Sequence, residues 1–211
     1  IGLFNQPEKV YLDIETWKTL PERQLSSGLA ETIKHACLAD GEMFDYLEKN
    51  IEKILVNDKD ACEYIAEHNC AVKYKVVMKD ERESGLREVL NLGHTVGRAI
   101  ETVSDYQLLH GEAVSIGLIA QAKLGEKYGY ISPENVSRVI KLCERAKLPV
   151  AIPDYIDKAA LVRKLYTDKK VRDGKLRMVF QKEIGDVMCF GDNDYAKQIT
   201  EPEIAEVIDE M

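Results

Sequence analysis

The chain has 211 residues, 45% of them apolar, and its 29 basic and 37 acidic side chains leave a net charge of −8. Because charges of both signs are interspersed, the composition excludes a strongly basic protein of the kind that binds nucleic acid or an anionic membrane. No apolar run approaches the roughly 18 residues of a membrane span and no signal peptide opens the chain, so we expect a globular protein of the cytoplasm.

The first expected element is a strand, and a series of helices follows it. Residues Lys9–Ile14 alternate and are rich in β-branched and aromatic side chains, which predicts one short strand. Apolar residues at helical spacing between Pro21 and Asp40 predict a helix that begins at the proline. By the same criteria, further helices are expected at about 42–55, 58–79, 84–104, 111–129, 133–146, 157–167 and 201–210.

Short connections between these helices, without strands between them, are typical of an α-helical bundle. Late in the chain, residues 175–181 and 186–190 flank Lys182–Gly185, and this pattern predicts a β-hairpin at about 175–190. We therefore expect a mainly α fold in which residues 16–211 form a single helical domain. Five widely spaced cysteines without a Cys-x-x-Cys pair predict reduced and mostly buried thiols.

Two histidines and one glutamate indicate a metal site. His94 lies between Gly93 and Gly97, and each glycine costs about 1 kcal/mol relative to alanine inside a helix, so a close approach to another helix or a ligand is expected there. A chain reversal before His110 would bring its imidazole back to His94. With Glu31, a carboxylate in an apolar helical segment, they would form a catalytic zinc site with one open position. The competing interpretation is a satisfied core histidine.

Polar side chains surround these three residues in the sequence. Arg87, Asn91, His94 and Arg98 follow one another at intervals of four, three and four residues, so one helix would place them on one face. A solvated polar stripe is the alternative interpretation of that pattern.

A cluster of lysines also indicates an anionic substrate. Lys34 lies one turn after Glu31, and Lys73, Lys79 and Arg87 can add positive charge nearby, which suits carboxylate and phosphate groups. Glu83 is expected to orient a base or to pair with Arg87. The lysines of Asp168–Lys170 are expected to bind an anion or to lie in solvent, and His35 and His68 are expected to be structural or surface residues.

From end to end, the chain resembles the C-terminal domain of the 3-dehydroquinate synthase family, which has the dehydroquinate synthase-like and glycerol dehydrogenase-like fold. The resemblance rests on these segments: Ile1–Pro7, Leu20–Lys34, Asp80–Glu81, Gly85–Arg87, Leu90–Thr95, His110–Val114 and Asp168–Lys170. It implies Zn²⁺, or another divalent metal such as Co²⁺, bound by Glu31, His94 and His110.

The resemblance also implies a reaction. A phosphorus–oxygen lyase of the shikimate pathway would convert 3-deoxy-D-arabino-heptulosonate 7-phosphate, a phosphorylated keto-sugar acid, to 3-dehydroquinate and phosphate, with transient oxidation by NAD. NAD would be bound by an N-terminal domain expected to precede Ile1, with residues 1–15 as its strand and linker. No NAD-binding residue is expected here, the chain alone is expected to be inactive, and the enzyme is expected to be a homodimer.

Residue roles follow from the resemblance. Lys73 and Arg87 would face the substrate carboxylate and ring hydroxyls, and Glu83 would assist proton transfer. The phosphate would be met by Lys34, Asn91, Lys169 and Lys170. The residues expected to take part in catalysis are thus Lys34, Lys73, Glu83, Arg87 and Asn91.

Arg98 departs from the family pattern, which has a second histidine at this position. An arginine can bind phosphate, but with a pKa above 12 it cannot shuttle protons near neutrality. Two alternatives therefore stay open: a related sugar-phosphate cyclase or metal-dependent polyol dehydrogenase, and a non-catalytic helical module stabilised by zinc.

Overall fold

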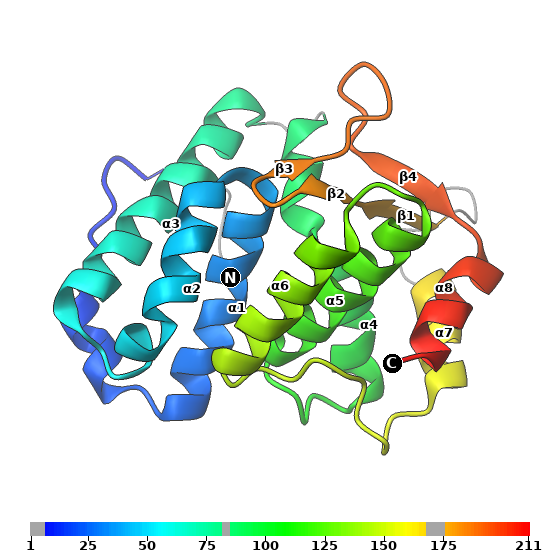
Figure 1. Cartoon of the computed structure of the whole chain (residues 1–211), viewed down its shortest axis with the longest axis horizontal. Helices are drawn as coiled ribbons and strands as arrows, with labels where there is room; N and C mark the ends of the chain where they lie inside the picture. Colours follow the sequence, from blue (N-terminus) through cyan, green and yellow to red (C-terminus); the bar gives the residue numbers. More distant parts are fainter. Residues whose placement is uncertain (1–6, 82–84, 168–175) are drawn as a thin grey trace.

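The computed structural model describes residues 7–81, 85–167 and 176–211, and within them the chain is mainly helical (Figure 1). The helices α1–α3 lie together at one end, α4–α6 form the middle, and α7 and α8 lie at the other end. Their bounds are α1 Glu22–Ala39, α2 Gly41–Leu55, α3 Lys59–Lys79, α4 His94–Val103, α5 His110–Lys127, α6 Pro133–Arg145, α7 Lys158–Thr167 and α8 Glu201–Asp209. The predicted α-helical architecture is confirmed.

Helix α5 separates two apolar clusters of the core. Leu118 and Ile119 of α5 pack into the cluster formed with α1, α2, α3 and α6. Ile116 and Ala120 pack into the other cluster, which contains side chains of α4, α7, α8 and the strands. Because α5 is apolar on all sides, it is stable only as a buried central helix. Its first residue, His110, is therefore fixed to this central helix, although its side chain is 49% exposed.

The strand predicted at Lys9–Ile14 is wrong. The segment before Ile14 is irregular, and Tyr11 within it is 81% exposed. A 3₁₀ helix then begins at Ile14 and ends at Thr19, with the carboxylate of Asp13 accepting the N–H of Glu15. An alternating pattern becomes a strand only where another strand or a core buries one face, and the described residues provide neither here.

The single helix predicted over 84–104 is also wrong. A 3₁₀ helix spans Leu86–Asn91, the helical conformation is interrupted at Leu92 and Gly93, and α4 begins at His94. Gly93 has a φ of +77°, which glycine adopts without the strain that a side chain would add. Arg87 and Asn91 consequently do not share a helix face with His94 and Arg98.

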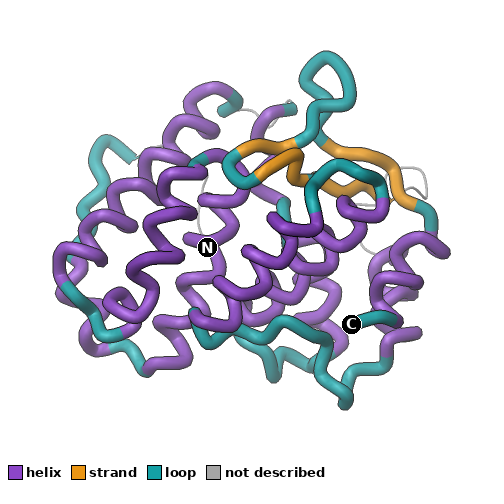
Figure 2. The backbone as a smooth tube through the Cα atoms, viewed as in Figure 1, coloured by secondary structure: helices purple, strands orange, loops and turns teal. Residues whose placement is uncertain are grey.

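The predicted hairpin is only partly correct. Strand β2 (Gln181–Glu183) pairs with β3 (Asp186–Val187) across a turn at Gly185, as expected. However, β1 (Leu176–Val179) pairs antiparallel with β4 (Ala196–Ile199), a strand that the sequence pattern missed. Figure 2 shows both pairs along one edge of the helical layer.

Two further expectations concern cysteines and membranes. All five cysteines are free, and three of them, Cys37, Cys62 and Cys143, are buried, as predicted. None of the helices in the described part of the chain combines the length and the apolar character that a membrane crossing requires.

Candidate metal centre

Three helices bring together the three residues that the sequence predicts to bind a metal. Glu31 lies in the middle of α1, while His94 and His110 are the first residues of α4 and α5. The Oε1 atom of Glu31 lies 3.3 Å from Nε2 of His94 and 3.4 Å from Nε2 of His110. One potential ligand atom from each residue lies within 4.8 Å of the other two. The set is compact enough for all three to reach one ion.

The second nitrogen of each imidazole faces an oxygen. Nδ1 of His94 lies 3.1 Å from the carbonyl of Leu92, and Nδ1 of His110 lies 3.1 Å from Oε1 of Glu101. If each Nδ1–H donates to that oxygen, the lone pair of Nε2 is left for a metal. Burial, followed by the positive charge of Lys34, lowers the pKa of His94 to about 4, so this imidazole is neutral near pH 7.

Lys34 sets the state of the Glu31 carboxylate. Its Nζ is 2.7 Å from Oε2 of Glu31 and 3.1 Å from the carbonyl of Leu90, and only 3% of the Lys34 surface is exposed. Burial would raise the pKa of Glu31, but the charge and hydrogen bond of Lys34, together with smaller effects of His94 and His35, lower it overall. The carboxylate is thus ionised, with one oxygen bound to Lys34 and the other available.

The available oxygen tests whether these residues fit a metal. Oε1 of Glu31 is buried and accepts no hydrogen bond, although it faces two imidazole nitrogens. A buried carboxylate oxygen without a partner is costly. One glutamate and two histidines are the donor set of a catalytic zinc site, and a divalent ion would satisfy all three. The residues present therefore fit a metal.

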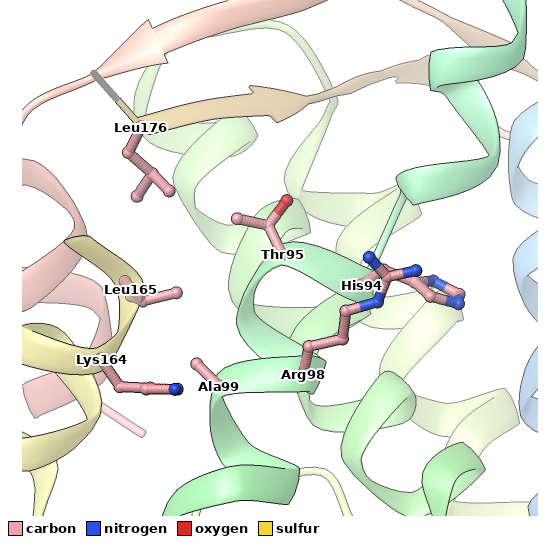
Figure 3. A pocket seen from close by; sticks show the side chains of 7 residues that line it. All are labelled: His94, Thr95, Arg98, Ala99, Lys164, Leu165 and Leu176. Atoms are coloured by element: carbon pink, nitrogen blue, oxygen red, sulfur yellow. The ribbon is translucent and has the colours of Figure 1, made fainter. Parts of the chain in front are cut away.

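Positive charge gathers beside this centre. The charges of Lys73 and Arg98 both act on Lys34 and lower its pKa, after the larger effects of burial and of Glu31, which raises it. Figure 3 shows a small pocket beside His94, lined by Arg98 from α4 and Lys164 from α7. Thr95, Ala99, Leu165 and Leu176 complete its lining. An anionic group bound near the metal would meet these cations.

The segment before α4 contacts the centre mainly through its backbone. The carbonyls of Leu90 and Leu92 face Lys34 and His94. Arg87 lies earlier in the same segment, where its backbone N–H donates to Asp80 and its guanidinium donates to the carbonyl of Glu81 at 3.2 Å. Asn91 is half-buried and lies in the sequence between Leu90 and Leu92, whose carbonyls make these two contacts.

The structure does not place every predicted residue at the centre. Lys79 lines a separate open hollow with Asp80, Leu86, Asn193 and Tyr195. Glu83, Lys169 and Lys170 lie outside the described residues, together with Asp168. Both other histidines are structural, as predicted, because His35 bonds Asn69 at 2.9 Å and His68 bonds Asp40 at 2.7 Å.

Sequence reasoning missed two residues that contact the centre or its supports. Glu101 faces His110, and Gln121 of α5 accepts the N–H of Gly93, next to His94. Gln121 is buried within an apolar helix, and that position is the signal that could have identified it. Glu101 carries no such signal, because its partner depends on how α4 and α5 pack.

Solved structures give the class of this fold. The chain matches 2-deoxy-scyllo-inosose synthase, complexed with carbaglucose-6-phosphate, NAD⁺ and Co²⁺, with a TM-score of 0.86 at 22% identity, over 100% of this chain and 58% of that one. It also matches 2-epi-5-epi-valiolone synthase from Streptomyces hygroscopicus subsp. jinggangensis, with NAD⁺ and Zn²⁺ bound, with a TM-score of 0.81 at 26% identity, over 93% and 53% of the two chains. The fold is that of the dehydroquinate synthase-like synthases.

Sequence comparison then gives the family. The family model of the 3-dehydroquinate synthase C-terminal region matches residues 28–171. The 3-dehydroquinate synthase of Acetivibrio thermocellus is 42% identical over 94% of this chain and 56% of its own length, and that of Methylococcus capsulatus is 46% identical over 88% and 52%. The chain belongs to the 3-dehydroquinate synthase family, as its motifs predict. It spans about half the length of these curated relatives.

Proposed function

We propose that this chain is the metal- and substrate-binding part of a 3-dehydroquinate synthase. The whole enzyme would convert 3-deoxy-D-arabino-heptulosonate 7-phosphate to 3-dehydroquinate and phosphate. The observation that carries the proposal is the buried, unpartnered Oε1 of Glu31 between the Nε2 atoms of His94 and His110, in a chain of this family. Metal and NAD⁺ bound to the 2-epi-5-epi-valiolone synthase support the same cofactors here.

Glu31, His94 and His110 would bind Zn²⁺ or Co²⁺, and an N-terminal domain would bind NAD. When bound, these groups would supply Lewis-acid polarisation of a substrate oxygen and reversible acceptance of a hydride. Lys34 keeps the Glu31 carboxylate ionised through the 2.7 Å contact. The Leu92 carbonyl and the Glu101 carboxylate fix the orientation of the two imidazoles.

The cations around the centre would bind the acidic parts of the substrate. Lys73 and Arg98 are exposed and act electrostatically on the buried Lys34, so they are close enough to meet an anion that approaches the metal. Arg98, one turn after His94, would bind phosphate without transferring a proton. By family resemblance, Arg87 and Asn91 would bind the carboxylate side and the phosphate side.

Several parts of the proposal rest on the resemblance alone. Glu83 would assist proton transfer, and Lys169 and Lys170 would bind phosphate. The enzyme would act in the shikimate pathway, in the cytoplasm and as a homodimer, and this chain alone would be inactive. The phosphorus–oxygen lyase activity would require the NAD-binding domain.

Phosphate release tests the substrate. The full-length protein that carries this chain should release phosphate from 3-deoxy-D-arabino-heptulosonate 7-phosphate in the presence of NAD and Zn²⁺, and should form 3-dehydroquinate. Turnover of a sugar phosphate that has no carboxylate, without turnover of this keto-sugar acid, would instead identify a related sugar-phosphate cyclase. Arg98, which departs from the family pattern, is the residue that keeps this alternative open. A polyol dehydrogenase would oxidise its substrate without releasing phosphate.

Metal analysis tests the centre. Single replacements Glu31→Ala, His94→Ala and His110→Ala should each abolish stoichiometric Zn²⁺ binding, whereas His68→Ala should leave it intact. Retention of one ion per chain in all three variants would show that the metal lies elsewhere. A purely structural zinc site would need a fourth protein ligand, and the described residues supply three.

A further inference from the structure

One face of α1 runs alongside the first turn of α5, and three matched polar contacts join the two helices along this face. Arg23, Ser27 and Glu31 are separated by four residues each, so they lie along one face of α1. Their partners are three consecutive residues of α5, in reverse order. The contacts are Arg23 with Glu112, Ser27 with Gly111, and Glu31 with His110. The metal centre is thus the last of three matched contacts.

The middle contact brings the two backbones together. The N–H of Gly111 donates to Oγ of Ser27 at 3.1 Å. A Cβ added to Gly111 would lie 1.8 Å from the backbone oxygen of Ser27, which leaves no room for any side chain. At this point the start of α5 lies directly on α1. A rotation of α5 about this contact would move its neighbours, His110 on one side and Glu112 on the other.

The first contact opposes such a rotation. Nε and Nη2 of Arg23 each lie 2.7 Å from one oxygen of Glu112, and Nη2 also donates to the carbonyl of Gln107 at 3.0 Å. The same Glu112 carboxylate accepts the N–H of Leu109 at 2.8 Å, which closes the first turn of α5 around His110. A bidentate arginine fixes direction as well as distance. Gly111 is thus bonded directly to Ser27 of α1, and Leu109 is held through Glu112, which Arg23 of α1 contacts.

We propose that Arg23 is a positioning residue for the metal centre: by holding Glu112 it fixes the first turn of α5 and keeps Nε2 of His110 facing Glu31. The inference rests on the proposed metal site. Arg23 is 58% exposed and lies two helical turns before Glu31, so it contacts no proposed ligand itself. The Glu112 side chain is only 13% exposed, so metal affinity and ligand geometry, rather than stability, separate this role from a general structural one.

Zn²⁺ affinity of the full-length protein, measured by competition with a chelator, tests the proposal. Arg23→Ala should weaken Zn²⁺ binding by about tenfold, the lower end of the effect of residues that orient metal ligands. It should also change the visible absorption spectrum of the Co²⁺-loaded protein, which reports ligand geometry. Arg23→Lys keeps the charge but not the bidentate contact, and should restore part of the affinity.

The chain offers a closely matched control. Arg145 of α6 binds both oxygens of Glu52 at 2.9 Å and donates to the carbonyl of Glu48 at 2.7 Å, the same set of contacts that Arg23 makes. Arg145→Ala should leave Zn²⁺ affinity and the Co²⁺ spectrum unchanged. Equal losses in both alanine variants would overturn the proposal, as would wild-type affinity and spectrum in Arg23→Ala.

Two further measurements keep the test decisive. If Arg23→Ala does not fold, Glu112→Gln retains an acceptor for Leu109 and should still weaken Zn²⁺ binding, so unchanged affinity in that variant would overturn the proposal. Wild-type binding that is lost in His94→Ala supports the metal centre independently of Arg23. A wild-type protein that binds no Zn²⁺ would overturn the proposed function, whereas normal binding in Arg23→Ala overturns only the positioning role.

Discussion

The helices around the metal centre are joined by a different kind of contact from the one that joins α2 to α6. Around the metal centre, α5 contacts α1 and α4 through glycines: added Cβ atoms at Gly111 and Gly117 would lie 1.8 Å and 2.0 Å from backbone oxygens. Between α2 and α6, long charged side chains add to the apolar packing of the core. Arg138 and Arg145 reach across to carboxylates of α2, including Glu48.

Because of this difference, we expect substitutions at the contacts of α5 with α1 and α4 to have larger effects than substitutions between α2 and α6. Helices in backbone contact cannot be moved apart without displacing His94 and His110, which begin α4 and α5. Helices joined by flexible side chains can shift by small amounts while the side chains adjust. The centre is therefore built where packing leaves least freedom.

The largest effect is expected at Gly117. In Gly117→Ala the new Cβ would lie 2.0 Å from the oxygen of Gly93 and 2.7 Å from the nitrogen of Gly97, and both are backbone atoms that cannot rotate away. We expect a loss of about 3 kcal/mol or more in the free energy of unfolding, measured with denaturant, together with loss of Zn²⁺ binding.

Gly28→Ala is the matched control for Gly117→Ala. Gly28 also lies inside a helix, but a Cβ there would meet nothing within 4 Å. This variant should gain about 0.5–1 kcal/mol, because alanine loses less conformational entropy in a helix. Equal destabilisation of the two variants would contradict the importance of the backbone contact.

The same contacts explain what the sequence could predict. Helical spacing and caps located α1, α2, α3, α5, α6, α7 and α8 to within a few residues, because those signals are local. Helical spacing also continued through Leu86–Asn91, so the break at Gly93 was missed. Its left-handed φ and its contact with α5 are set by the tertiary fold. Strand β4 was missed because Ala196–Ile199 is weakly β-forming and pairs with distant residues.

The candidate centre divides in a similar way. Glu31, His94 and His110 could be found because their residue types are those of zinc ligands. Glu101, Arg23 and Glu112 are charged residues of ordinary helices, and only the packing of α1, α4 and α5 gives them their partners. Arg87 and Asn91 were placed on a helix face that does not exist, although both lie in the segment whose carbonyls contact the centre.

Acid should lower the stability of the packing between α1 and α3, where a histidine is buried. His35 of α1 bonds Asn69 of α3, and burial, followed by the charge of Lys34, lowers its pKa to about 4. Because the unfolded chain binds this proton near pH 6.5, the stability from neutral His35 is complete above that pH and falls as the pH decreases to about 4.

His35→Gln, which cannot titrate, tests this effect. Between pH 7 and pH 4.5 the wild-type protein should lose about 2–3 kcal/mol more than the variant, measured as free energies of unfolding in urea. The metal-free protein is used for both, so that His94 titrates equally in the two. Identical pH dependence of the two proteins would show that His35 is not the acid-sensitive group.

A smaller effect is expected at Glu101, whose Oε1 faces Nδ1 of His110 at 3.1 Å. Glu101→Gln keeps an oxygen acceptor but removes the charge that makes the imidazole a better ligand. Zn²⁺ affinity should fall by about tenfold, or roughly 1.4 kcal/mol. Thr102→Ala, which removes a hydroxyl bonded to the Arg98 carbonyl in the same helix, should leave the affinity unchanged. An unaffected Glu101→Gln would mean that the ring of His110 is oriented by its helix alone.

The smallest effect is expected where long side chains join the helices. Arg145→Ala removes an ion pair whose side chains are 41% and 64% exposed, so the free energy of unfolding should fall by less than about 1 kcal/mol. Added salt should reduce this difference further, because exposed charges are screened. Urea unfolding at low and high salt measures both. A salt-independent loss above 2 kcal/mol would mean that the α2–α6 face is as constrained as the metal centre, and the contrast between glycine contacts and side-chain contacts would then not explain where the centre lies.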